Sequence, residues 1–223
     1  MGCQCQKPDE QINELVAEKN ELKNLEQNNN RFYVKNNYNS AENKSQNNNK
    51  PEDPFSQYIF EKINELRENP QSFIDLIDEA KKNIQTDEKT GIKVYKTSVK
   101  VALYKGEKAF EEAIEILKNT QPMEKLQFNP DFVIDLPNNE LDLKSKNYLV
   151  DQIKIKIDSG IDVKSFWKDI VNDKESCFIL TVVDDSGANA GNKREDILNK
   201  DNKYIGISTA KIGRSFACYI VLG

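Results

Sequence analysis

Residues 184–223 read DDSGANAGNKREDILNKDNKYIGISTAKIGRSFACYIVLG, and this stretch decides the fold. Alternating apolar and polar positions predict two strands, over residues 203–210 and 215–222, joined by a Lys-Ile-Gly-Arg turn. The second strand carries closely spaced apolar and aromatic residues, namely Phe216, Tyr219, Ile220, Val221 and Leu222. Because such a hairpin must bury its apolar side chains, we expect upstream segments to cover it and the hairpin to form the floor of the fold.

A second pattern runs through the same stretch. It consists of Asp184-Asp185, Gly187, Arg194, Ile197, Gly206 and Tyr219–Gly223. This pattern resembles the end of a CAP domain, also called SCP, the family of cysteine-rich secretory, antigen 5 and pathogenesis-related 1 proteins. That family closes with a loop of the form D-D-G...G-H-R-x-N-I and two strands, G-I/V-G and Y-x-V-x-F-G; the loop histidine is absent here. The resemblance implies an α+β fold, a CAP-like α-β-α sandwich over residues 54–223.

The region near residue 54 predicts a pair of helices. Residues 55–67 carry apolar side chains at helical spacing and stop at Asn69-Pro70, because the residue before a proline is pushed out of the helix. A second helix is expected over residues 71–84. The connection Asn-Glu-x-Arg-x-Asn-Pro resembles the opening of the CAP domain, in which Asn64 and Arg67 match a recurring N-x-x-R. A further amphipathic helix is predicted over residues 107–119.

Two further segments are read from their side-chain patterns. Residues 91–104 alternate apolar residues with lysine and threonine, which predicts a polar-faced hairpin or an irregular extended insert whose lysines keep its edge soluble. Residues 177–183 form a short β-branched run that propensity favours as a buried strand. The CAP resemblance instead places a helix there, and we expect the helix.

The CAP family has a metal site made of two histidines and two acidic residues. The segment Leu126-Gln-Phe-Asn-Pro-Asp-Phe resembles the entry to the first helix of that site, with Phe128 in place of a tryptophan. Counting from it, the first histidine falls at Asn139 and the first acid at Ser165 or Phe166. The second acid meets Leu180 and its neighbours Ile179 and Thr181, and the second histidine falls at Lys193 or Asn192. The resemblance therefore implies a degenerate site that has lost all four ligands.

The composition points the same way, because the chain contains no histidine. A neutral imidazole ligand or a general base near neutral pH is thus absent, and Lys193 would place a cation where a divalent ion is expected. We expect no metal, no cofactor and no metal-dependent catalysis. Asp184 and Asp185 are expected to satisfy amides of the loop over residues 187–191, and Cys177 and Cys218 to pack as small apolar residues. Trp167 is expected to anchor the core.

The chain begins MGCQCQKP, and residues 1–7 read as a lipidation motif. Gly2 is the acceptor for N-myristoylation, and Cys3 and Cys5 stand where such proteins are often palmitoylated. Because one acyl chain holds a protein at a membrane only marginally, a second chain would give stable anchoring. Gln6 departs from the preferred Ser or Thr. The alternatives are that the motif is accidental, or that the cysteines form a C-x-C metal pair without further ligands, which makes a poor zinc site.

The remaining N-terminal residues divide into two segments. Residues 8–27 predict an amphipathic helix, which either stays solvated or pairs with the domain or a partner helix as a weak coiled coil. Residues 28–53 form an Asn-rich linker with little aliphatic content. The formal net charge of −5 argues against a nucleic-acid or anionic-membrane binder that is held by electrostatics alone, and no run of eighteen apolar residues is present. The first twenty-five residues lack the apolar core of a signal peptide, so we expect a reducing cytosolic setting.

Together these features favour a non-catalytic CAP/SCP-like binding module at the cytoplasmic face of a membrane. Its expected partners are the membrane itself, through acyl chains, and a protein or lipid ligand; CAP domains that resemble this one are linked with sterol and fatty-acid binding. One alternative is a structural component docked in a large cytoplasmic or cytoskeletal assembly. The other is an enzyme whose site is not recognisable from the sequence.

Overall fold

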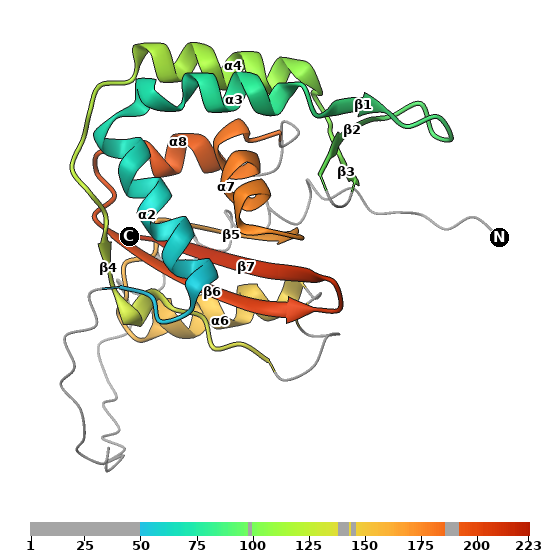
Figure 1. Ribbon diagram of the computed structural model, residues 1–223. Coiled ribbons are helices and arrows are strands. Elements are labelled where there is room, and N and C mark those ends of the chain that lie inside the picture. Colours follow the sequence, from blue (N-terminus) through green and yellow to red (C-terminus); the bar gives the residue numbers. More distant parts are fainter. Residues whose placement is uncertain (1–49, 98–99, 138–142, 144–145, 186–191) are drawn as a thin grey trace, which may run out of the picture. The chain divides into compact units, whose positions relative to one another are not determined.

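The computed structural model describes residues 50–97, 100–137, 143, 146–185 and 192–223, and shows an α+β fold. A four-stranded sheet in the order β4-β6-β7-β5 lies between helices on both of its faces (Figure 1). Its strands are β4 (Gln127–Phe128), β5 (Ser165–Val171), β6 (Tyr204–Ile212) and β7 (Ser215–Leu222). Strand β7 pairs antiparallel with both β6 and β5, and β4 pairs parallel with β6.

The C-terminal hairpin is confirmed and forms the middle of this sheet, but the expectation that it is the floor of the fold is wrong, because helices pack on both of its faces. Its first strand runs two residues further than expected, to Ile212, and pairs with Ser215 across a turn in which Gly213 has a φ of 57°. Since side chains alternate along a strand, β7 contributes to two hydrophobic cores. The first core contains Cys218, Ile220 and Leu222, and the second contains Ala217, Tyr219 and Val221.

Among the described residues, five helices cover the first core, and they include the helices predicted near residue 54, over residues 107–119 and over residues 177–183. They are α2 (Pro54–Glu68), α3 (Ile74–Lys81), α4 (Glu107–Asn119), α7 (Lys174–Val183) and α8 (Lys193–Ile197). The helix predicted over residues 107–119 is confirmed at both ends, and α2 extends the predicted 55–67 by one residue at each end. The helix predicted over residues 71–84 is wrong at both ends. It begins as a 3-10 turn, η1 (Pro70–Phe73), and ends at Lys81 because the amides of Lys82 and Asn83 bond back three residues.

Residues 177–183 are helical. Strand propensity and the CAP resemblance gave opposite predictions for this segment. The expected helix is confirmed as α7, which begins where Asp173 Oδ1 accepts a hydrogen bond of 2.7 Å from the Ser176 amide. Most of its side chains are buried, including Cys177, Phe178 and Val182. A helix buried on most sides carries few polar residues, which is why its sequence resembles a strand.

The second core lies on the opposite face of the sheet, under α6 (Lys146–Asp158) and the short turn η2 (Pro130–Phe132) (Figure 1). Phe132 packs against two glycines of the family-like pattern, Gly206 and Gly223. A Cβ added at Gly206 would lie 2.2 Å from the backbone carbon of Phe132, so no larger residue fits there. In the part of the chain that is described, no helix is long and apolar enough to cross a bilayer.

A separate three-stranded sheet extends beside α3 and α4 (Figure 1). It consists of β1 (Ile84–Thr86), β2 (Lys93–Lys96) and β3 (Lys100–Ala102), all antiparallel. The extended segment predicted over residues 91–104 is thus confirmed as a hairpin, to which β1 adds an unexpected third strand. Tyr95 and Leu103 point into the first core, where the Tyr95 ring lies 5.8 Å from that of Phe110.

Candidate functional site

The four positions to which the CAP resemblance assigns metal ligands are distributed as follows. Asn139 lies outside the described residues. Ser165 is half-buried at the start of β5, and Leu180 lies in α7 with its side chain packed against the first core. Lys193 is the first residue of α8. Leu180 therefore packs in the core and has no polar atom that could bind a metal ion.

Lys193 reaches β5, where its ammonium forms an ion pair with Asp169 Oδ1. Asp169 faces the helices, as Ser165 does, because residues 165, 167 and 169 alternate to the same side of the strand. The two side chains of the pair are only 18% and 16% exposed, so the contact is well shielded from water. No local pattern identifies Asp169 as the partner of Lys193, since only the strand register brings it under α8.

This ion pair limits what the side chains around Lys193 can bind. A protonated lysine paired with a carboxylate leaves no lone pair for a cation on the lysine and takes one oxygen of the acid. Among the described residues, no group of three or more His, Cys, Asp or Glu side chains could hold a metal ion. Within the described part, the pair leaves Asp169 Oδ2 buried without a hydrogen-bond partner, and the same holds for Ser165 Oγ and Trp167 Nε1 on the same face of β5.

Two thiols lie beside this pair. Cys177 from α7 and Cys218 from β7 are both buried, which agrees with the expected packing role. The pKa of Cys177 is raised well above its ordinary value, first by the hydrogen bond with Cys218 and then by burial. Because the thiolate is the nucleophilic form, a raised pKa disfavours nucleophilic chemistry at Cys177.

Asp184 and Asp185 both act on backbone groups. Asp184 ends α7 in a left-handed conformation, with a φ of 49°, and its Oδ2 accepts from the Arg194 amide at 3.4 Å. Asp185 accepts from the amides of Tyr104 and Lys105, the latter at 2.7 Å. Burial raises the pKa of Asp185. Both carboxylates thus accept from backbone amides as expected, but the amides are those of Tyr104, Lys105 and Arg194. The turn for which this role was expected, residues 187–191, lies outside the described part.

Arg194 completes this junction. Its guanidinium Nη1 donates to the carbonyls of Val182 and Val183, at 3.2 and 2.6 Å, and thereby caps the C-terminal end of α7. Burial lowers the pKa of Arg194. The arginine at this position of the pattern therefore stabilises the end of a helix.

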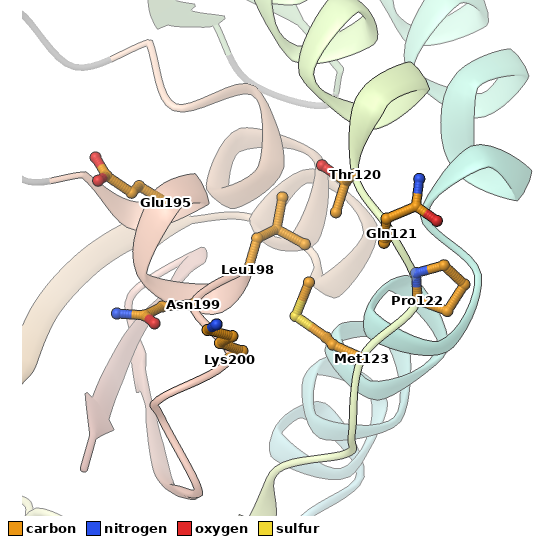
Figure 2. A pocket seen from close by; sticks show the side chains of 8 residues that line it. All are labelled: Thr120, Gln121, Pro122, Met123, Glu195, Leu198, Asn199 and Lys200. Carbon is orange, nitrogen blue, oxygen red and sulfur yellow. The ribbon is translucent and has the colours of Figure 1, made fainter.

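The second candidate is a groove that the sequence did not predict. It has a volume of about 510 Å³ and lies between the segment after α4 and the end of α8 (Figure 2). One wall is formed by Thr120, Gln121, Pro122 and Met123, and the other by Glu195, Leu198, Asn199 and Lys200. The groove thus offers apolar groups from Pro122, Met123 and Leu198 beside amide and charged side chains.

Arg67 joins the two segments that form this groove. Although it is fully buried, it donates hydrogen bonds to four backbone carbonyls. They belong to Glu124 on one side and to Ile197, Asn199 and Asn202 on the other, at 2.7 to 3.3 Å. Burial lowers the pKa of Arg67. The side chain therefore fixes the spacing of the two walls.

Asn64, the other residue of the N-x-x-R pattern, acts one turn earlier on α2. Its amide group exchanges two hydrogen bonds with the backbone of Leu126, at 3.1 and 2.7 Å. This contact holds the chain where it enters β4. Both residues of the pattern thus serve to position the segment over residues 123–126.

The proposed lipidation residues, Gly2, Cys3 and Cys5, lie outside the described part of the chain. The same holds for the predicted helix over residues 8–27 and for the Asn-rich linker up to residue 49. Comparison with known proteins finds no matching family model, no matching curated protein and no matching solved structure.

Proposed function

We propose that this chain is a non-catalytic, CAP-like binding module held at the cytoplasmic face of a membrane by acyl chains on Gly2 and on Cys3 or Cys5. The observation that carries the non-catalytic part is the shielded ion pair between Lys193 and Asp169. A lysine that neutralises the nearest carboxylate stands where the resemblance expects a histidine ligand. The α+β architecture, with helices on both faces of the sheet, supports the CAP part of the proposal.

The groove between residues 120–123 and 195–200 is the binding site that this proposal favours. Its volume falls in the range of about 300–1,000 Å³ that is usual for ligand sites. More of its accessible lining is apolar than polar, and Gln121, Glu195, Asn199 and Lys200 supply the polar groups, so the groove suits a short protein segment or a lipid with a polar head. Arg67 keeps its two walls in place before any ligand arrives, so binding there would lose little conformational entropy.

The tether is tested by the intact mass of the N-terminal peptide from the native source, before and after hydroxylamine, which removes thioester-linked acyl groups. We expect a hydroxylamine-resistant myristoyl mass on Gly2 and a labile mass on Cys3 or Cys5. The control is a Cys3→Ser/Cys5→Ser chain, which keeps the first mass and lacks the second. An unmodified N-terminus would exclude the tether.

A fractionation separates this proposal from a structural role in a large assembly. An acylated chain is expected to leave the membrane fraction with detergent and to resist salt, since its anchor is apolar. A particle that sediments without membranes and survives detergent would support the assembly instead.

A further inference from the structure

Among the described residues, strand β5 pairs with β7 alone and is therefore an edge of the larger sheet. It is seven residues long, whereas β4, at the opposite edge, has two. A strand at an edge presents backbone N–H and C=O groups that a further strand can bond. The long edge at β5 is thus the place where this sheet can be extended.

The pairing of β7 shows which residues of β5 direct their backbone groups outward. Between β6 and β7, Tyr204 and Gly223 exchange two hydrogen bonds, at 2.9 and 3.1 Å. Because these groups alternate in direction along a strand, the odd-numbered residues of β7 bond to β6 and the even-numbered ones to β5. The even-numbered residues stand opposite odd-numbered residues of β5. The residues of β5 whose N–H and C=O groups point outward, here called the open edge, are therefore Phe166, Lys168 and Ile170.

Two residues of the open edge have exposed apolar side chains. Phe166 is 38% exposed and Ile170 is 47% exposed. They stand opposite Val221 and Ala217, which belong to the second core, so they continue that core to the edge of the sheet. Apolar side chains that flank outward backbone groups in this way are typical of a strand that pairs with another chain.

Lys168, the third residue of the open edge, does not guard it. Edge strands often avoid pairing by placing a lysine where a second strand would approach. The Lys168 ammonium instead donates to the Leu143 carbonyl at 3.2 Å and lies 5.9 Å from the ring of Tyr219 in the neighbouring strand β7. Its charge is therefore directed over its own sheet and away from the open side.

A second copy of this chain has side chains that fit the open edge. Antiparallel pairing about a two-fold axis at Lys168 places Phe166 of each copy opposite Ile170 of the other. An aromatic residue opposite a β-branched one is a favourable pair across two strands. The same register aligns the outward groups of all three residues, which allows about six backbone hydrogen bonds between the copies.

We propose that β5 is a dimer interface, at which two copies of this chain join their larger sheets into one continuous sheet. Both copies use the same edge, so the contact closes on itself and gives a dimer rather than a fibre. An edge contact of this length is small, and we expect a dissociation constant on the order of 10 μM. The interface depends on neither the acyl tether nor the groove.

The test uses the full chain with Gly2→Ala, Cys3→Ser and Cys5→Ser, so that neither acyl groups nor N-terminal disulfides contribute. Sedimentation equilibrium from about 1 to about 200 μM should show the mass rising from that of one chain toward that of two. Ile170→Lys should raise the dissociation constant at least about tenfold, because it places a cation against Phe166 of the other copy. The matched control is Ile155→Lys, which adds the same charge at a residue of α6 that is 57% exposed and should leave the constant unchanged.

The register is tested by Lys168→Cys in the same chain. In a two-fold pair centred on residue 168, the two Cα atoms lie about 5.5 Å apart, a distance that a disulfide bridges. Oxidised glutathione, which is reduced as the two thiols join, should link the Lys168→Cys chains into a covalent dimer. Lys154→Cys, at an exposed position of α6, should give no such dimer.

A chain that stays monomeric at about 200 μM would overturn the proposal, even if β5 bound an extended peptide of another protein. Dimers that Ile170→Lys leaves intact, or that Ile155→Lys weakens equally, would overturn it too, because the contact would then lie elsewhere. Equal cross-linking of Lys168→Cys and Lys154→Cys would exclude the register. The fluorescence of Trp167, which lies in β5, checks that each variant keeps its fold.

Discussion

At the scale of single residues, the buried Arg67 bonds to four backbone carbonyls that lie far from it in the sequence. Its replacement by methionine keeps most of the apolar stem and removes the donors to four carbonyls. Because carbonyls left without partners in a buried setting are costly, we expect Arg67→Met to lower the free energy of unfolding by about 3 kcal/mol. Urea denaturation at neutral pH measures this. Arg214→Met, at an exposed arginine, should change it by less than about 0.5 kcal/mol, and equal effects would contradict the argument.

The residues of this network show what a sequence can and cannot reveal. The N-x-x-R pattern selected Asn64 and Arg67, but their partners lie 57 to 135 residues further along the chain. Nothing local in the sequence identifies a carbonyl as an acceptor, since every residue has one. Asp169 is similar, because only the register of β5 under α8 makes it the partner of Lys193.

At the scale of elements, the pH response of the small sheet is the clearest expectation. A hydrogen bond from Lys100, followed by bonds from Thr90, lowers the pKa of Asp87 from 3.8 to about 2. Since the folded-state pKa lies below the ordinary value, the ionised carboxylate stabilises the sheet fully above about pH 4, and this contribution is lost as the pH falls toward 2. A carboxyl-carbon NMR titration should place the midpoint of Asp87 near 2. Lys100→Gln is expected to raise it toward the ordinary value and Lys96→Gln to leave it in place; a midpoint near 3.8 in the unmodified chain would contradict this.

Elements were predicted best where one pattern repeats over several turns. The helix over residues 107–119 and the second strand of the terminal hairpin are confirmed at both ends. Strand β1 was missed because three residues are too few to show a period. The residues of α7 have a strand-like composition, and only the resemblance to the CAP family predicted a helix there. The groove was missed because two distant segments form it.

At the scale of the whole described domain, strand β7 joins the two cores. Its even-numbered residues from 218 to 222 pack with the helices around α7, and its odd-numbered residues from 217 to 221 pack with α6. A change in one core must therefore disturb the register that supports the other. The two cores are expected to unfold together, as is usual for a single domain of this size.

Trp167, the only tryptophan, tests this cooperativity because it reports from the first core. Val221→Ala removes two methyl groups from the second core, on the other face of the sheet, and should lower the free energy of unfolding by about 2 kcal/mol. If the cores unfold together, urea transitions followed by Trp167 fluorescence and by far-ultraviolet circular dichroism should coincide and shift by the same amount. Ile155→Ala, at a residue of α6 that is 57% exposed, should move neither transition by more than about 0.5 kcal/mol. A fluorescence transition that stays in place while the dichroism transition moves would mean that the second core unfolds by itself, and β7 would then be a boundary between two folding units.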